Sequence, residues 1–130
     1  MGDQLVKQYE CKFCALATSP YAMPYGSVYV ILDGYPVTKG HSLIIPKAHR
    51  DTYFELTDTE LRDTHEALVS LRLGAELCGI GDGFNIGWNC GDAAGQTVMH
   101  AHCHFIPRVF GDMADPRGGV RGVIPEKRLY

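Results

Sequence analysis

Residues 98–108 read Val-Met-His-Ala-His-Cys-His-Phe-Ile-Pro-Arg, so three of the chain's six histidines stand at every second position of one short segment. Side chains alternate between the two faces of a β-strand, and a strand here would place His100, His102 and His104 on one face, about 7 Å apart, with Ala101 on the other. Each buried imidazole needs partners for two ring nitrogens. Three neighbouring imidazoles therefore indicate chemistry rather than packing.

The segments around these histidines predict an α+β domain on an antiparallel sheet. Runs of β-branched and aromatic residues predict strands at residues 27–33, 41–45, 84–89 and 99–109. Thr57 and Glu60 have the spacing of a capping box, and the apolar pattern after them predicts a helix to about Cys78, with Leu61, Leu68, Leu71 and Ala75 on its buried face. Loops are expected at 18–26 and 91–95 and a turn at 34–40. The tail, 111–130, has no clear periodicity.

Length and composition fit one globular domain over residues 1–130. The chain is 45% hydrophobic and 21% charged, with a formal net charge of −3. Proteins that bind DNA or RNA usually carry a basic surplus, so no nucleic-acid partner is expected. No apolar run reaches the roughly 18 residues of a membrane span, so no membrane partner is expected either.

The cysteine count indicates reduced thiols. Five cysteines without a secretory signal favour the cytoplasm. Cys11 and Cys14 form a C-x-x-C pair, which fits a zinc half-site, a redox motif or coincidence. Cys78 and Cys103 are expected to be buried apolar thiols.

Two chemical uses of the alternating histidines remain open on the residues alone. One is metal binding, since His-x-His supplies two ligands from one strand. The other is nucleophilic catalysis, with one imidazole attacking an electrophilic phosphorus or carbon. The preceding loop, 91–97, carries Gly91, Gly95, Gln96 and Thr97, whose backbone and side-chain donors could approach a phosphate.

Two blocks of the sequence resemble the histidine triad (HIT) family. Residues 89–108, which include Gly-Gln-Thr-Val-Met-His-Ala-His-Cys-His-Phe-Ile-Pro-Arg, are similar to the family's His-φ-His-φ-His signature. Residues 40–49, Gly-His-Ser-Leu-Ile-Ile-Pro-Lys-Ala-His, are similar to its second conserved block. The resemblance covers about residues 11–108 and leaves 109–130 as a C-terminal extension. It implies a sheet of about five strands with one long and one short helix, and a homodimer.

The resemblance also implies roles for individual residues. His102 would be the nucleophile on the α-phosphorus, and His104 would support charge at the phosphates. The remaining positions implied to be catalytic or to bind substrate are Gln96, which is both, and Asp33, His41, Asn89 and Thr97. A neutral imidazole suits this chemistry, since it is a competent nucleophile near neutral pH.

A metal site follows from the same resemblance. Some bacterial members join an N-terminal C-x-x-C to two histidines, which here implies Cys11, Cys14, His49 and His100 as ligands. Four protein ligands close a tetrahedral Zn²⁺ site and leave no position for water, so the zinc would be structural. It would also hold His100 and thereby the segment that carries His102. No organic cofactor is expected.

The function that this implies is hydrolysis of a nucleotide at its α-phosphate, through a nucleotidyl-histidine intermediate that releases a nucleoside monophosphate. The expected substrate is a dinucleoside polyphosphate or a similar nucleotide. The alternatives are an adenosine phosphoramidate hydrolase, a nucleotide-binding regulatory module with little turnover, and a zinc-dependent hydrolase that uses the histidines as metal ligands. In the tail, Arg117 to Arg121 form either a solvated segment or a flap over the active site.

Overall fold

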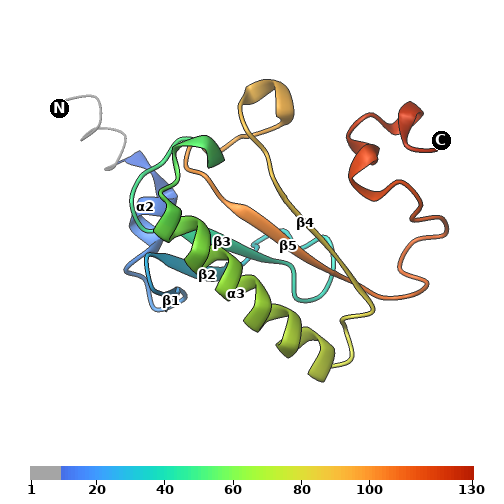
Figure 1. The fold of residues 1–130 in the computed structure, drawn as a ribbon, viewed down its shortest axis with the longest axis horizontal. Coiled ribbons are helices and arrows are strands. Elements are labelled where there is room, and N and C mark those ends of the chain that lie inside the picture. The colour runs from blue at the N-terminus through green and yellow to red at the C-terminus, as the bar shows by residue number, and fades with distance from the viewer. Residues whose placement is uncertain (1–9) are drawn as a thin grey trace.

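A five-stranded antiparallel sheet with the order β1-β2-β3-β5-β4 organises the chain (Figure 1). The computed structural model describes residues 10–130. The strands are β1 (Met23–Tyr25), β2 (Val28–Leu32), β3 (Ser42–Pro46), β4 (Gly83–Trp88) and β5 (Cys103–Arg108). The helices are α2 (Lys12–Leu16) and α3 (Asp58–Leu77). The predicted α+β class, with about five strands and one long and one short helix, is confirmed.

The long helix α3 lies across one face of the sheet (Figure 1). Its Ala67 and Ala75 pack with side chains of the three central strands to form the larger core. The strand residues of this core are Val28, Val30, Ile44, Cys103 and Phe105. They stand at alternate positions of their strands, as a sheet with one face against a helix requires.

The helix begins as the sequence predicts. The hydroxyl of Thr57 accepts from the backbone N–H of Glu60 at 3.1 Å, and the carboxylate of Glu60 accepts from the N–H of Thr57 at 2.8 Å. This capping box satisfies two backbone donors that the first turn leaves free. At the other end, the predicted burial of Cys78 is wrong. Cys78 is the C-cap residue of α3 and is exposed. The thiol of Cys103 is buried, as predicted.

The short helix α2 covers part of the opposite face. Phe13 of α2 packs against Tyr29, Leu43 and Ile45, which alternate with the residues that face α3. The hydroxyl of Tyr29, fully buried, donates to the backbone carbonyl of Phe13. A buried hydroxyl without a partner is costly, so this bond fixes α2 on the sheet.

The sequence analysis missed β1, because two prolines made residues 18–26 resemble a loop. Pro24 lies in β1, opposite Tyr29, at the outer edge of the sheet. Proline lacks a backbone donor and is tolerated in edge strands, where one side of the strand has no neighbour. The turn after β1 uses Gly26 at a φ of +62°, a conformation that favours glycine.

The last strand is shorter than predicted. It begins at Cys103 rather than near residue 99, so His100 and His102 precede it and only His104 lies within it. The expected single row of three imidazoles is therefore wrong. The backbone N–H of Ala101 donates to the carbonyl of Arg50 at 2.7 Å, which draws this segment out of the sheet. The three rings consequently have different surroundings.

The C-terminal segment runs past β4, away from α2 (Figure 1). It contains two short 3₁₀ helices, Gly119–Val123 and Pro125–Lys127. Within residues 10–130, no helix combines the length and the apolar character that a membrane crossing needs.

A carboxylate joins α3 to the turn between β1 and β2, and it makes stability depend on pH. Asp63 accepts from the backbone N–H of Ser27 at 2.7 Å and from its hydroxyl at 2.6 Å. These hydrogen bonds lower the pKa of Asp63. A lowered folded pKa gives stability that is present above the unfolded pKa and is lost as pH falls through the folded pKa.

We therefore expect Asp63→Ala to lower Tm at neutral pH, with a difference from the wild type that shrinks as pH falls below about 4. Thermal denaturation across pH 2.5–7 measures this difference. Glu66→Ala, on the exposed side of α3, is the control. A difference that stays constant across the range would contradict the assigned role.

Candidate functional site

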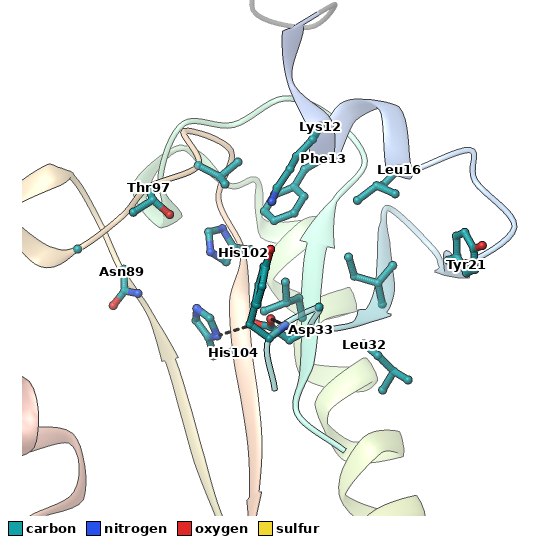
Figure 2. A pocket seen from close by; sticks show the side chains of 16 residues that line it. Lys12, Phe13, Leu16, Tyr21, Leu32, Asp33, Asn89, Thr97, His102 and His104 are labelled. Atoms are coloured by element: carbon teal, nitrogen blue, oxygen red, sulfur yellow. Dashed lines mark hydrogen bonds and ion pairs between the residues drawn. The ribbon is translucent and has the colours of Figure 1, made fainter. Parts of the chain in front are cut away.

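A cavity of about 660 Å³ opens beside the histidines on the α2 face of the sheet (Figure 2). This volume is in the range of small-molecule sites. Part of its lining is apolar, with Phe13, Leu16, Ile31 and Leu43. Polar side chains that line it include Lys12, Asp33, Asn89, Thr97, His102 and His104. The residues come from α2, from the end of β2, from the loop before β5 and from β5 itself. We call this space the triad cavity.

His102 has one nitrogen fixed and one available. Its Nδ1 lies 2.9 Å from the carbonyl oxygen of His100. A carbonyl only accepts, so Nδ1 carries the proton in this contact and Nε2 keeps a free lone pair in the neutral ring. Phe13 packs edge-on against the ring, with centroids 5.0 Å apart, and restricts its rotation. The geometry therefore prepares an unprotonated Nε2 in a ring that lines the triad cavity.

His41 and His104 form a proton-ordered pair. The backbone N–H of Val37 donates to Nδ1 of His41 at 3.0 Å, so a neutral His41 carries its proton on Nε2. That Nε2 lies 2.9 Å from Nδ1 of His104, which must then accept. The remaining nitrogen of His104, Nε2, carries a proton and acts as a donor. His41 itself is buried and does not line the cavity.

Asp33 anchors the same pair from the end of β2. Its Oδ1 accepts from the backbone N–H of Tyr35 at 2.8 Å. Its Oδ2 lies 3.4 Å from Nε2 of His41 and 4.0 Å from Nδ1 of His104, the latter drawn as a dashed line in Figure 2. The carboxylate keeps acceptor capacity toward the cavity. It can therefore receive hydroxyl donors from a bound ligand.

The surroundings keep these imidazoles neutral. Burial lowers the pKa of His102, against the opposing hydrogen bond to the His100 carbonyl. Burial also lowers the pKa of His104, helped by the neighbouring His102 and His41. Burial also lowers the pKa of His41, and the charge of Asp33 acts in the opposite direction. Near neutral pH the site thus presents one free imidazole lone pair and one imidazole N–H donor.

A second cluster, of Cys11, Cys14, His49 and His100, lies behind His102. We call it the Cys2His2 cluster; its four ligand atoms lie within 4.8 Å of one another. Cys14 Sγ is 3.2 Å from Nδ1 of His49 and 3.4 Å from Nδ1 of His100, and Cys11 Sγ is 3.3 Å from the latter. Tetrahedral zinc, with bonds of about 2.3 Å to sulfur and about 2.1 Å to nitrogen, separates such atoms by about 3.6 Å. The donor set and its spacing fit this ion.

The outer nitrogens of the two histidine ligands are already paired. Nε2 of His100 donates to the carbonyl of Pro46 at 2.8 Å, and Nε2 of His49 lies 3.1 Å from a carboxylate oxygen of Asp51. Both contacts leave Nδ1 unprotonated and directed at the cysteines, the arrangement found at metal-bound histidines. Burial lowers the pKa of His100 to about 4. Burial and the Cys11 thiol raise the pKa of Cys14 to about 12, so its thiolate form needs a nearby cation.

Most residues implied by the sequence come together here. Asp33, Asn89, Thr97, His102 and His104 line the triad cavity, and the four metal-site residues form one cluster. Two implied substrate-binding residues do not reach the cavity: His41 lies behind His104, and Gln96 is buried. No residue of 109–130 lines the cavity, so the tail is not a flap over it in this structure.

Gln96 organises the loop instead of facing the cavity. Its Oε1 accepts from the N–H of Gly91 at 2.8 Å, and its Nε2 donates to the carbonyls of Asp51 and Val98 at 2.7 and 3.0 Å. These bonds use both ends of the amide. The loop needs them because Gly91 and Gly95 have φ near +90° and no side chain of their own to stabilise the turn. Gln96 thereby fixes the position of the neighbouring Thr97, which does line the cavity.

The sequence analysis missed the part that α2 has in the site. Phe13 touches His102 and also His100, with centroids 6.0 Å apart in the second pair. Lys12 and Leu16 line the cavity as well. The available signal was the C-x-x-C itself: if Cys11 and Cys14 meet His100, the residues between them must lie near the triad.

The fold and site define a class of α+β proteins with neighbouring histidines at one end of the sheet. Here His102 and His104 line a ligand cavity, and His100 belongs to a cysteine cluster. The model of the HIT domain matches residues 23–111, and the chain accordingly belongs to the HIT family. Members of this family bind nucleotides and are commonly hydrolases or transferases.

Three known proteins illustrate the similarity. An uncharacterized HIT-like protein of Methanocaldococcus jannaschii is 37% identical over 113 residues, 78% of this chain and 81% of that protein. The adenylylsulfatase HINT3 of Arabidopsis thaliana is 40% identical over 106 residues, 78% of this chain but only 53% of that protein. The crystal structure of a Zn-bound histidine triad family protein from Mycobacterium smegmatis is similar with a TM-score of 0.74 and 32% identity, covering 83% of this chain and 81% of that one.

Proposed function

We propose that this protein hydrolyses a dinucleoside polyphosphate or a similar nucleotide at its α-phosphate and releases a nucleoside monophosphate. The observation that carries the proposal is the tautomer of His102, whose Nδ1 is bonded to the His100 carbonyl and whose Nε2 is free. A ring so fixed is a nucleophile that needs no base to activate it.

The reaction has two displacements at phosphorus. The lone pair of His102 Nε2 forms an N–P bond while the bond from phosphorus to the leaving oxygen breaks, and that oxygen takes the electron pair. Water then forms a new P–O bond, the N–P electron pair returns to Nε2, and the water proton passes to solvent. In the intermediate the imidazole ring is positively charged, and the His100 carbonyl stabilises this charge through the Nδ1–H bond.

The other residues hold the nucleotide. The Nε2–H of His104, with Thr97 and Asn89, serves as donor to the phosphate oxygens. Asp33 accepts from the ribose hydroxyls, and the apolar lining residues Leu16, Ile31 and Leu43 take the base. His41 acts behind His104, and Gln96 acts by positioning Thr97 rather than by touching phosphate.

Other substrates share this mechanism and differ only in the leaving group. Adenosine phosphoramidate loses ammonia, because its leaving nitrogen takes up a proton from solvent as the P–N bond breaks, and adenylyl sulfate loses sulfate. Adenylyl sulfate is a candidate because the Arabidopsis relative is an adenylylsulfatase. A module that binds nucleotide without turnover is the remaining alternative.

We propose further that the Cys2His2 cluster binds one structural Zn²⁺. The ion would be held by Cys11, Cys14, His49 and His100. It would thereby cross-link α2 to the segment that carries His102. Within residues 10–130 two groups of side chains could hold a metal, the Cys2His2 cluster and the set of Asp33, His41 and His104. His102 belongs to neither, so the proposed nucleophile is not a metal ligand.

We propose further that the protein is a homodimer and lies in the cytoplasm. β4 is the last strand of the sheet, and Ile86 on it is exposed. Val69, Leu73 and Leu77 form an exposed apolar stripe at every fourth position of α3. A free strand edge and an apolar stripe suit the pairing of two copies. Reduced cysteines suit a reducing compartment.

We expect His102→Ala to lower turnover about 10³-fold or more while nucleotide affinity stays within a few-fold, because the nucleophile is lost and the cavity is kept. Steady-state kinetics with diadenosine tetraphosphate, adenosine phosphoramidate and adenylyl sulfate, with calorimetric binding, measures both. A wild-type reaction quenched at alkaline pH should give a nucleotide adduct on His102 by mass spectrometry. Unchanged turnover in the variant would exclude the covalent mechanism, and binding without any turnover by the wild type would favour the regulatory module.

We expect one zinc ion per chain by elemental analysis, because four protein ligands close the coordination sphere. Cys14→Ala should lose the metal and lower Tm together with nucleotide affinity, since α2 would be released from His100. Cys78→Ala, an exposed cysteine outside the cluster, is the control and should keep its zinc. Activity lost on chelation while Tm is unchanged would instead support a catalytic metal.

We expect light scattering to give about twice the 14.3 kDa mass of one chain at micromolar concentration. A mass of a single chain under these conditions would contradict the homodimer and would leave the exposed stripe on α3 without this explanation.

A further inference from the structure

One fixed positive charge lines the triad cavity within residues 10–130. Among the described residues that line it, Lys12 is the only lysine or arginine. Lys12 is the first residue of α2 and is exposed, so it stands at the mouth of the cavity. It also lines an adjoining cavity of about 400 Å³ with Thr97, Val98 and Met99. The ammonium group thus lies at the end of the triad cavity formed by the loop before β5.

Phe13 holds this charge near the nucleophile. The Nζ of Lys12 lies over the Phe13 ring, 5.4 Å from its centroid. The same ring is edge-on to His102 at 5.0 Å. Figure 2 shows Lys12, Phe13 and Thr97 on one side of His102, with His104, Asp33 and Leu32 on the other. In the part of the chain that the structure describes, Lys12 forms no ion pair, so its charge is available to a ligand.

This position is suited to the leaving group rather than to the nucleoside. The bond that breaks lies opposite the attacking nitrogen, so the leaving group departs away from His102 toward the mouth. In the proposed function the nucleoside end is the one with Asp33, Ile31 and Leu43, whereas Phe13 lies at the Lys12 end. An anion at the nucleoside end would meet the Asp33 carboxylate, whereas an anion at the Thr97 end would meet the Lys12 ammonium.

We infer that Lys12 determines specificity by favouring substrates whose leaving group is an anion, a polyphosphate or a sulfate, over substrates that release a neutral amine. The inference rests on the proposed function and names its substrate class. When the α-phosphorus–oxygen bond breaks, negative charge grows on the departing oxygen, and a nearby ammonium stabilises that charge. Release of ammonia from a phosphoramidate leaves no such charge for Lys12 to stabilise.

The test compares two substrates in three variants. Lys12→Met removes the charge and keeps the length, Lys12→Arg restores the charge, and Lys47→Met removes an exposed lysine outside the cavity. The measured quantity is the ratio of kcat/KM for diadenosine tetraphosphate to that for adenosine phosphoramidate. Zinc content and Tm are checked for each variant, because Lys12 lies between two cluster cysteines.

We expect Lys12→Met to lower this ratio roughly 5- to 10-fold, as for a partly screened charge, with Lys12→Arg recovering most of it and Lys47→Met leaving it unchanged. The ratio should fall with added salt in the wild type and stay flat in Lys12→Met. A ratio unchanged in Lys12→Met, or lowered equally in Lys47→Met, would overturn the inference.

Binding separates this inference from the proposed function. In the His102→Ala background, Lys12→Met should weaken diadenosine tetraphosphate several-fold more than it weakens AMP, which lacks the leaving group. If the wild type hydrolyses neither substrate, the proposed function fails, and this comparison still decides the role of Lys12. Equal weakening of both ligands, or of neither, would refute it.

Discussion

The hydrogen bond between His102 Nδ1 and the carbonyl of His100 is the contact on which the site depends. It spans only two residues, yet it assigns the tautomer of the ring and leaves Nε2 free. It exists because the chain has not yet entered β5 at these positions. In a regular strand the carbonyl of His100 would be directed to a neighbouring strand, and the three rings would be equivalent. The late start of β5 is therefore a condition of the chemistry.

That short contact is held in place from two sides. His100 is bonded to the carbonyl of Pro46 on β3 and faces the sulfur atoms of Cys11 and Cys14. Phe13, which lies between those cysteines in the sequence, packs against both His100 and His102. A single helical turn thus belongs to both the Cys2His2 cluster and the triad cavity. A change in the cluster therefore reaches His102 both through the His100 carbonyl and through Phe13.

Hydrogen bonds also fix the histidine tautomers on the phosphate side of the cavity. One backbone N–H, from Val37, determines the tautomer of His41, and His41 in turn determines that of His104. The result is a complementary pair in one site, with a lone pair on His102 and a donor on His104. Two identical side chains acquire opposite roles from their partners alone. Gln96 achieves a similar effect for Thr97 by using its whole amide on backbone groups of its own loop and of Asp51.

The sequence by itself determined the sheet class and the start of α3. Local signals carried these: alternation of apolar residues and the Thr57–Glu60 capping box. The four residues of the Cys2His2 cluster were implied by the resemblance to the HIT family, since the spacing of the cysteines alone left other uses open. Tertiary structure alone decided where β5 begins and that Pro24 lies in an edge strand. It also decided that the Gln96 side chain is buried against backbone groups instead of facing the cavity. It also brought Phe13 and Lys12 beside a histidine almost ninety positions away. Such contacts join segments distant in the chain, and a periodicity read along one segment contains no information about the partner that competes for its hydrogen bonds.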